Sequence, residues 1–595
     1  MPELPKSMRY KEALAELSEH LESLGDCCRK LELEELKARS STKSFLQFSD
    51  GWRINIPCSD GAVEVEYLLD HNFPYSPPKL ALVSKPDDKK LPHVFTDGSL
   101  CLMPNHGEVS PFNPVAVFDE MLTEAHTLIS DGSSGALDGD YDDEFLSYWR
   151  TGVVNPETPI LSLLSCKGKT RHVSLVRGAK EWIVAEDQAD GLRWLKNRRG
   201  TDAAQKSWTR AVYVWLEQPP SLKDFDSTNR SLLEWLDGLD GDGKKVVKKA
   251  LKKPNCLVVF GFDTGNGVAL AGVFVTPRKP TKKVKSRQTA IISQLANTDQ
   301  TKLLDIQRID HAWVHGRGYD YRSPILSEKK VVVIGCGSVG SAVTKLLAEA
   351  GVGTLDLIDP DNMSWANIGR HVLGADCVGK QKADALAQTL QTQFPHLHIA
   401  SHGALGWQEV YAYKSSMFDD ADLIISATGS WQAEAQLNDL ALTKGENFPT
   451  IVYGWTEPFG VAGHAVVIPA GKGCFACGFD AVGRPHHTVV DWKDVSQLKQ
   501  EPACGTSFQP YGPIELSYVN TVIANAGLEV LISGSPTEAC RSVWVARKSY
   551  VSDAGGEWSA KWSEIFGDRQ DGGQTISVPW SPEKTCMACR GKHFK

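Results

Sequence analysis

A glycine-rich turn in the segment VVVIGCGSVG has the residue types and spacing needed to bind a phosphate. The apolar run Val331–Ile334 predicts a buried parallel strand, and Gly335, Gly337 and Gly340 follow it in G-x-G-x-x-G spacing, opening a helix expected over Ser341–Ala350. Glycines at these positions let the backbone approach a phosphate, and the helix N-terminus supplies N–H groups and a favourable dipole. Taken alone, the turn would indicate a dehydrogenase that binds a dinucleotide.

The polar residues after the turn favour ATP instead. A second strand is expected to end at Asp359 and Asp361, and Asp359 lies about 20 residues past the glycines, where an acid binds ribose hydroxyls. Asn367, Arg370 and Lys382 come next, spaced so that a loop and a helix could bring them over a polyphosphate. When a carboxylate attacks an α-phosphate, Arg and Lys stabilise the developing charge. The cluster predicts adenylation; the alternative is a structural Rossmann domain with solvated charges.

In these elements, residues 331–440 resemble the adenylation domain of the ubiquitin-activating, ThiF and MoeB superfamily. The matching motifs are G-x-G-x-x-G, D-x-D, N-x-x-R and G-x-x-K, in that order. The resemblance implies that ATP and Mg²⁺ are cofactors. It also implies that Asp359 binds the ribose and that Asn367, Arg370 and Lys382 bind the phosphates.

Two positions depart from the pattern of this superfamily. Gly429 follows the predicted strand ADLIISATGS where the superfamily usually has an aspartate that holds Mg²⁺, so Asp361 becomes the candidate ligand. Upstream, His311 stands where a second arginine is common. The candidate phosphate contacts in this upstream region are Arg308, Arg317 and Arg322.

Four cysteines form two C-x-x-C pairs, Cys474 with Cys477 and Cys586 with Cys589. Four thiolates suffice for a closed tetrahedral zinc site, and the long gap means that zinc would tie the C-terminal end of the domain to its middle. Adenylation domains of the superfamily often carry such a split site. Redox-active pairs are the alternative, and a disulfide framework is less expected in an intracellular chain.

Cys504 precedes a short loop with Pro and Gly and then a long predicted helix. This arrangement resembles the surroundings of the thioester-forming cysteine in activating enzymes. An acyl-adenylate is a reactive mixed anhydride, and a nearby thiolate can capture its acyl group. Cys540 is the competing thiol, and a buried core cysteine is the alternative for both.

Cys101 lies in LPHVFTDGSLCLMPN, after FPYSPPKL and before a predicted helix. This order resembles the ubiquitin-conjugating fold, in which an H-P-N element precedes D-G-S-[IL]-C-L and the cysteine carries a thioester. Here His93 stands where that fold usually has asparagine, and it could donate a hydrogen bond in its place. His106 is also nearby and is expected to be a loop residue.

The elements that position these residues require several domains, because 595 residues exceed a single core. We predict a multidomain α/β protein: a ubiquitin-conjugating-like α+β domain over 1–155, a middle α/β linker domain over 156–310, and a Rossmann-like adenylation domain with a zinc site over 311–595.

The net charge of −9 provides no overall positive potential that would indicate direct binding of nucleic acid. The sequence has no secretory signal pattern and no long uncharged apolar span, so we expect a cytoplasmic protein without a membrane partner.

The order of these domains resembles that of the bacterial fusion proteins of CBASS antiphage operons. The resemblance implies that ATP adenylates the C-terminus of a cGAS/DncV-like nucleotidyltransferase, and that the acyl group passes to Cys504, to Cys101 and then to a target amine. It also implies a homodimer through the adenylation domain. The rival hypotheses are an activating enzyme for a ubiquitin-like or sulfur-carrier protein, an NAD-dependent oxidoreductase and a non-enzymatic scaffold.

Overall fold

The computed structural model describes most of the chain. The described residues are 8–39, 48–58, 61–84, 91–95, 97–102, 110–153, 158–166, 168–200, 208–219, 234–236, 238–251, 256–275, 302–403, 405–493, 499–500, 507–508 and 510–591. The chain divides into two compact units. The first comprises Met1–Glu157, Cys166–His172 and Arg210–Ile306, and the second comprises Thr158–Ser165, Val173–Thr209 and Gln307–Lys595.

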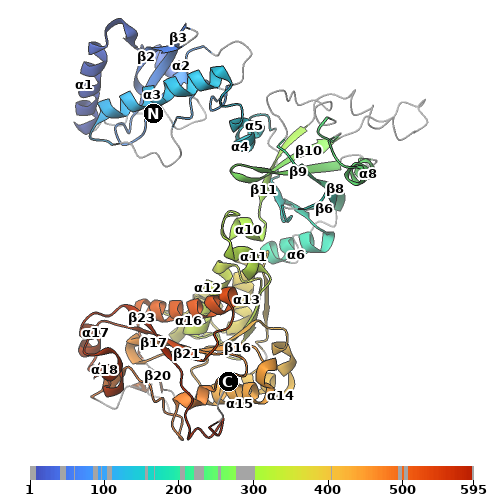
Figure 1. Ribbon diagram of the computed structural model, residues 1–595, viewed down its shortest axis with the longest axis vertical. Coiled ribbons are helices and arrows are strands. Elements are labelled where there is room, and N and C mark those ends of the chain that lie inside the picture. Colours follow the sequence, from blue (N-terminus) through green and yellow to red (C-terminus); the bar gives the residue numbers. More distant parts are fainter. Residues whose placement is uncertain are drawn as a thin grey trace. The chain divides into compact units, whose positions relative to one another are not determined.

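The N-terminal part of the first unit is an antiparallel sheet covered by helices (Figure 1). Its strands are β1 (Cys28–Lys30), β2 (Phe48–Cys58), β3 (Gly61–Asp70) and β4 (Lys79–Leu82), in that spatial order. The helices are α1 (Met8–Ser23), α2 (Leu33–Arg39) and α3 (Pro114–Ser134). Apolar side chains of α1, α3 and the sheet form one core. Asn113 begins α3 by accepting a hydrogen bond from the Ala116 N–H, and Gly135 ends it in a left-handed conformation.

Two short helices, α4 (Asp140–Asp143) and α5 (Phe145–Thr151), follow α3 within the first unit. Phe145 and Trp149 of α5 pack into the core formed by strands β8 (Trp208–Trp215), β9 (Cys256–Thr264) and β10 (Gly267–Val275) and helix α8 (Gly241–Ala250). Asp140, Glu144 and Tyr148 of this segment contact His93, which precedes Cys101 in the same loop.

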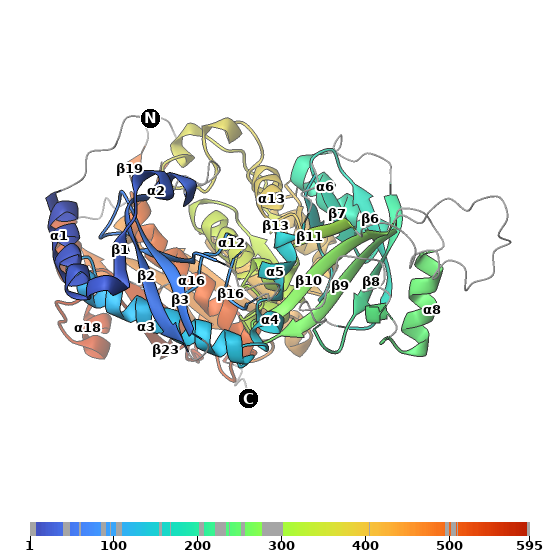
Figure 2. The same cartoon turned by 90° about the horizontal axis from the view of Figure 1, so that it is seen from above.

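The strands of the middle segment are ordered as a closed barrel, β10-β11-β5-β7-β6-β8-β9 (Figure 2). The remaining strands are β5 (Ile160–Ser162), β6 (Arg171–Arg177), β7 (Trp182–Ala185) and β11 (Lys302–Arg308), and the helix α6 (Gln188–Arg199) follows β7. The sequence predicted a middle α/β linker domain over 156–310, whereas closure of the strands into a barrel was not predicted.

The second unit contains an eight-stranded sheet in the order β14-β13-β12-β15-β16-β17-β21-β23. The first five strands are parallel: β14 (His398–Ser401), β13 (Thr354–Ile358), β12 (Lys330–Ile334), β15 (Leu423–Ser426) and β16 (Thr450–Thr456). The last three are antiparallel: β17 (Ala462–Ile468), β21 (Cys540–Val545) and β23 (Gln574–Pro579). A mostly parallel α/β sheet was predicted and is confirmed. The runs of four consecutive buried residues in the central strands reflect a sheet that is covered on both faces.

Helices cover both faces of this sheet. One core joins the sheet to α12 (Ser338–Ala350), α13 (Lys382–Gln393) and α16 (Pro513–Ser533), and another joins it to α14 (Trp407–Tyr413) and α15 (Trp431–Lys444). The remaining short elements are α10 (His311–Val314), α11 (Arg322–Ser327), α17 (Lys548–Asp553), α18 (Ala560–Phe566), β18 (Val490–Trp492), β19 (Lys499–Gln500), β20 (Ser507–Phe508) and β22 (Gly556–Trp558). Of the described helices, α16 is long and apolar enough to span a membrane, but more than half of it is buried against the sheet.

Candidate functional site

A cavity of about 560 Å³ opens at the carboxyl ends of the parallel strands. The chain runs from β12 to β13 and β14 on one side and then returns to β15 on the other, so strand order reverses between β12 and β15. Ligands of open α/β sheets bind in the crevice at such a reversal. The cavity is lined there by Gly337 and Ser338 after β12 and by Thr428 and Gly429 after β15. The other lining residues are Val339, Asn367, Arg370, His371, Ala427, Trp431, Glu434, Gly454, Trp455, Thr456, Phe479, Pro485 and Tyr511.

The three glycines of the turn have different roles in the structure. Gly335 has a φ of +89°, and a Cβ there would lie 2.8 Å from the Ala427 carbonyl oxygen. A Cβ at Gly340 would lie 1.8 Å from the Gly335 oxygen, so this glycine is required by close packing. Around Gly337 no described atom lies within 4 Å of such a Cβ. Only the middle glycine therefore leaves space that a ligand could use.

The acids and the lysine predicted from the sequence lie at the end of β13 and the start of α13. Asp359 is buried and accepts hydrogen bonds from the Cys336 N–H at 2.7 Å and the Asp361 N–H at 2.9 Å. Burial raises the pKa of Asp359. Asp361 pairs with Lys382 at 2.9 Å, and its side chain is 69% exposed. Lys382 thus has an acid partner that a phosphate could replace.

Asn367 and Arg370 both line the cavity, and their role as phosphate contacts stays a prediction. The Asn367 Oδ1 accepts from the Ser364 N–H at 2.9 Å, which directs its amide. The Arg370 guanidinium lies 5.2 Å from the centroid of the Tyr511 ring, and none of the ion pairs among the described residues involves it. Arg370 is therefore a cation that faces the cavity without an acid partner in the described part of the chain.

Several lining residues were not predicted from the sequence. Tyr511 shares a hydrogen bond with Ser338 at 2.9 Å, and His371 bonds the Cys336 carbonyl oxygen at 2.7 Å. Burial lowers the pKa of His371. The only sequence signal for His371 is its place directly after Arg370, and Tyr511 comes from a distant segment.

Glu434 of α15 is a further unpredicted residue of the cavity. It is 5% exposed, and its carboxylate accepts from the Thr428 hydroxyl at 3.3 Å. The Gly429 N–H also donates to it, but burial dominates and raises the pKa of Glu434 to about 8. No cation pairs with it among the described residues.

Two of the three upstream arginines form ion pairs away from the cavity. Arg308 pairs with Asp310 at 2.9 Å, and Arg322 pairs with Asp320 at 2.7 Å. Arg317 has a φ of +51° in the turn between α10 and α11. None of the three lines the cavity. Their role as phosphate contacts stays a prediction.

The four cysteines of the C-x-x-C pairs lie together and are buried, with all Sγ atoms within 4.8 Å of one another. The Cys474–Cys586 and Cys477–Cys589 Sγ distances are 3.9 and 3.6 Å, too long for disulfides. Thiolates of a tetrahedral zinc site with Zn–S bonds of about 2.3 Å lie about 3.8 Å apart. A hydrogen bond with the Cys477 thiol lowers the pKa of Cys474 to about 6, which favours the thiolate form. The donor set fits zinc.

Cys101 lies in the first unit and is exposed. Its N–H donates to the His93 carbonyl oxygen at 2.8 Å, so the two residues are held side by side. The His93 imidazole lies between two carboxylates, with Nε2 at 2.9 Å from Asp140 and Nδ1 at 3.3 Å from Glu144. The His93 N–H donates to the Tyr148 hydroxyl at 2.8 Å. Partial burial and then Glu144 raise the pKa of the Cys101 thiol.

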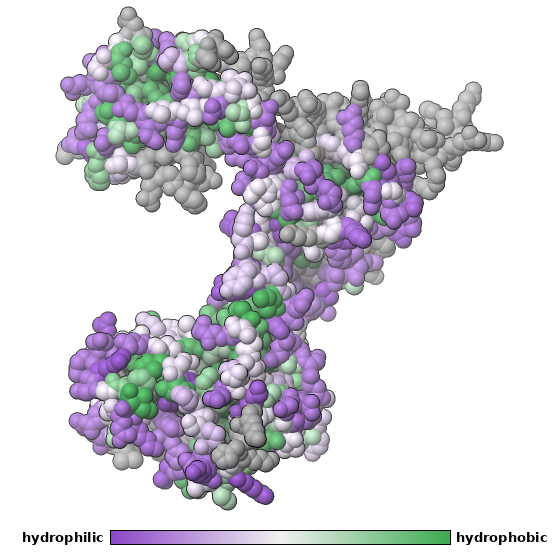
Figure 3. Space-filling model, viewed as in Figure 1, coloured by the Kyte–Doolittle hydropathy of each residue, from purple (hydrophilic) through white to green (hydrophobic). Residues whose placement is uncertain are grey.

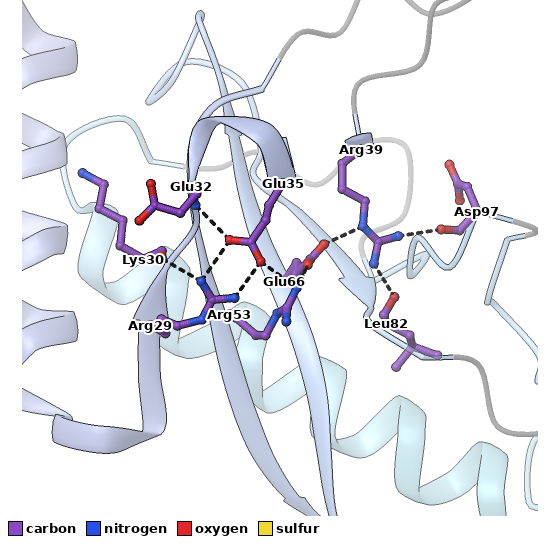
Figure 4. Close-up of polar contacts among 9 residues, drawn as sticks. All are labelled: Arg29, Lys30, Glu32, Glu35, Arg39, Arg53, Glu66, Leu82 and Asp97. Atoms are coloured by element: carbon purple, nitrogen blue, oxygen red, sulfur yellow. Dashed lines mark hydrogen bonds and ion pairs between the residues drawn. The ribbon is translucent and has the colours of Figure 1, made fainter. Parts of the chain in front are cut away.

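An arginine of α2 fixes the turn that precedes Cys101 (Figure 4). Arg39 donates to the carbonyl oxygens of Leu82 at 2.7 Å and Asp97 at 3.0 Å. Its other contact is Glu66, which is 3% exposed and also binds Arg53 at 2.7 Å. This network ties the loop of Cys101 to the sheet.

The candidate thiol Cys504 and the loop residue His106 lie outside the described residues. The competing thiol Cys540 begins β21 and is partly buried, and burial raises its pKa. The choice between Cys504 and Cys540 stays a prediction.

Two protein families match the chain. The ThiF family matches residues 322–531, and the prokaryotic E2 family B matches residues 20–153. The chain joins an E2-type domain to a ThiF-type domain. The fusion expected from the sequence is thereby confirmed.

Curated relatives match the chain over most of its length or over part of it. The ATP-dependent ubiquitin transferase-like protein Cap2 of Escherichia coli is 24% identical over 470 residues, which are 71% of this chain and 77% of the relative. Cap2 of Vibrio cholerae is 22% identical over 516 residues, or 80% and 87% of the two chains. Ubiquitin-like modifier-activating enzyme 5 of Oryza sativa is 24% identical over 274 residues, or 44% and 59%. A crystal structure of E. coli MccB with AMPCPP and MccA is 18% identical, covers 45% of this chain and 68% of its own, and has a TM-score of 0.31.

The chain is accordingly an enzyme with E1-like and E2-like parts. These matches support ATP-dependent adenylation and ubiquitin-like conjugation as its chemistry.

Proposed function

We propose that this enzyme uses ATP to activate the C-terminal carboxylate of a partner protein and then joins the carboxyl group to an amine of a target. The observation that carries the proposal is the cavity at the strand reversal, where Gly337, Asn367 and the unpaired Arg370 face the same space. An NAD-dependent oxidoreductase would need no cation at that place, and a scaffold would need no cavity.

In the first step, a carboxylate oxygen attacks the α-phosphorus of ATP, the bond to pyrophosphate breaks, and an acyl-adenylate forms. Arg370, Asn367 and Lys382 hold the phosphate oxygens, with Lys382 exchanging Asp361 for the nucleotide. Asp359, already fixed by two backbone N–H groups, keeps free lone pairs for a ribose hydroxyl. Mg²⁺, when bound with the nucleotide, adds positive charge beside the phosphates.

The acyl group then moves through two cysteines. The Cys504 thiolate attacks the acyl carbonyl and AMP leaves; the Cys101 thiolate attacks the resulting thioester and Cys504 leaves. Finally, an amine of the target attacks the Cys101 thioester, loses a proton and forms an amide as the thiolate leaves. The exposure of Cys101 supports its place as the last carrier, because the target must reach it.

The partner and the assembly are inferred by analogy. We propose a cGAS/DncV-like nucleotidyltransferase C-terminus as the activated group, in cytoplasmic antiphage defence, and zinc at the four cysteines. We also propose a homodimer through the ThiF-type domain. Its support is an exposed set of apolar and aromatic side chains at α10 and α11, on a domain whose surface includes apolar patches (Figure 3): Trp313, Val314, Tyr319, Tyr321 and Ile325.

Pyrophosphate exchange tests the activation step. The full-length chain is incubated with ATP, labelled pyrophosphate and carboxyl-terminal peptides of the candidate partner or of a ubiquitin-like protein ending in Gly-Gly. Exchange that depends on the nucleotidyltransferase peptide supports the proposal, and exchange with the Gly-Gly peptide alone favours the rival. If neither peptide gives exchange or a reducible adduct, the activation hypothesis is wrong.

Variants of the two cysteines test the relay. Cys101→Ala is expected to retain an adduct on Cys504 that dithiothreitol removes, but to form no final product. An adduct that survives Cys504→Ala would instead assign the first thiol to Cys540.

A further inference from the structure

The cavity contains a buried acid whose counter-charge is missing. Glu434 is 5% exposed, and the partners that its carboxylate has among the described residues are the Thr428 hydroxyl and the Gly429 N–H. Glu457, another buried acid of this unit, has more partners: it accepts from two backbone N–H groups at 2.7 and 3.2 Å and contacts His464 at 2.9 Å. A buried carboxylate without a cation costs several kcal/mol if ionised, in order-of-magnitude terms, so its retention requires an explanation.

The position of Glu434 provides that explanation. Its carboxylate lies beside Thr428 and Gly429, which form the cavity wall after β15, and it lines the same cavity as Arg370. Gly429 is the position at which a metal-holding aspartate was expected. A Cβ at Gly429 would meet no described atom within 4 Å, so the wall is open there. Glu434 of α15 lines the cavity together with Gly429.

We propose that Glu434 supplies the carboxylate that faces the divalent cation bound with the nucleotide, in place of the acid absent at position 429. The inference rests on the proposed function, because the cation enters with ATP. Magnesium is usually bound by one or two carboxylates together with phosphate oxygens and waters, so a single protein carboxylate is sufficient. Asp361 fits this role less well, because its carboxylate already pairs with Lys382 and is mostly exposed.

Nucleotide binding with and without magnesium tests the assignment without relying on turnover. ATP affinity is measured by calorimetry on the full-length chain in Mg²⁺ and in EDTA. In the wild type, Mg²⁺ is expected to strengthen binding about tenfold or more, as expected for a charge-assisted contact worth about 1.4 kcal/mol. Glu434→Gln, which keeps the shape of the side chain, should reduce that gain to less than about twofold and leave the affinity in EDTA unchanged or higher.

Two further variants keep the test decisive. Adding Gly429→Asp to Glu434→Gln should restore most of the magnesium gain, since the site is open and aspartate tolerates a left-handed backbone better than most residues. Glu434→Asp, which shortens the reach by one methylene, should give an intermediate gain even if the glutamine variant does not fold. Glu349→Gln is the control and should keep the wild-type gain, because Glu349 pairs with Lys345 on the surface of α12 and does not line the cavity. Asp361→Asn tests the competing acid.

The outcomes separate the two proposals. Wild type that binds no ATP in either buffer would overturn the proposed function itself. If wild type binds ATP and exchanges pyrophosphate, but Glu434→Gln or Glu434→Asp keeps the full magnesium gain, only the assignment of Glu434 is wrong. Loss of the gain in Asp361→Asn would assign the cation to Asp361 and likewise overturn it.

Discussion

The Cys101 site and the nucleotide cavity each differ from the expected pattern at one position, and in each a nearby helical segment places acids beside that position. His93 stands where asparagine is usual, and Asp140 and Glu144 lie on either side of its ring. Gly429 stands where aspartate is usual, and Glu434 of α15 lies behind it.

The two sets of acids differ in their surroundings. The carboxylates around His93 are 36% and 32% exposed, and each of them contacts a nitrogen of the imidazole ring. Glu434 is 5% exposed and has no cation among the described residues. The acids of the first site thus have a partner within the chain, whereas in our proposal a bound cation supplies the partner in the second. The following predictions test that contrast.

Arg370→Ala should have the largest effect, because it removes a cation that faces the cavity. Losing a donor that stabilises developing charge costs about 100-fold or more in rate. Pyrophosphate exchange is expected to fall by about that factor, with the fold retained. Lys345→Ala is the control, since Lys345 lies on the outer side of α12 and pairs with Glu349. If Arg370→Ala kept pyrophosphate exchange within about twofold of the wild type, Arg370 would not contact the phosphates.

Substitution of His93 should affect the last transfer but not the earlier ones. His93→Ala is expected to slow discharge of the Cys101 thioester to a lysine amine by about 10- to 100-fold in single-turnover assays, while Cys101 still becomes charged. His93→Asn should also slow it, because Asp140 and Glu144 lose their partner. Adding Asp140→Asn and Glu144→Gln should then recover part of the rate. No recovery would mean that His93 acts through its own ring chemistry rather than through this cluster.

Loss of the four-cysteine cluster should disturb the ThiF-type domain alone. Cys586→Ser is expected to lower the zinc content from one ion per chain to less than about half and to reduce thermal stability. ATP binding in the cavity should weaken as well, because the cluster is connected to the core of the domain through Trp580. The Trp580 indole N–H donates to the Cys474 carbonyl oxygen, and its ring stacks on Phe475. Alkylation of Cys101 by iodoacetamide, followed by mass spectrometry, should keep its wild-type rate. If Cys586→Ser changed the alkylation rate of Cys101 as well as the zinc content, the two sites would not be independent and this prediction would be wrong.

A fall in pH should lower the free energy of unfolding of the ThiF-type domain, and we expect this effect to be smaller than those above. Burial, followed by its histidine neighbours, lowers the pKa of His396 to about 3, so His396 stays neutral in the folded chain. The unfolded chain takes up a proton near pH 6.5, so stability is lost as the pH falls from about 6.5 towards 3. His396→Gln should reduce this loss by up to about 1 kcal/mol per pH unit, measured from urea unfolding at pH 7 and pH 5. His126→Gln, an exposed position on α3, should leave the pH dependence unchanged.

The elements of both domains could be predicted from the sequence because their signals are local. The strand before Gly335, the helix after Pro114 and the paired cysteines all follow from spacing and residue type. Their mutual placement could not be predicted in the same way. Tyr511 and Glu434 enter the cavity from segments with no motif, and Asp140 and Glu144 reach His93 only because Phe145 and Trp149 anchor α5 in another core. Contacts of this kind depend on packing between elements distant in sequence.

The backbone conformation at His93 bears on which substitutions this position tolerates. Its φ of +59° lies in the left-handed region, which asparagine adopts as readily as histidine. The backbone would therefore not oppose a return to asparagine. The two carboxylates would, because a single reversion removes the ring nitrogens that both of them contact. Chains related to this one are therefore expected to vary His93, Asp140 and Glu144 together or not at all.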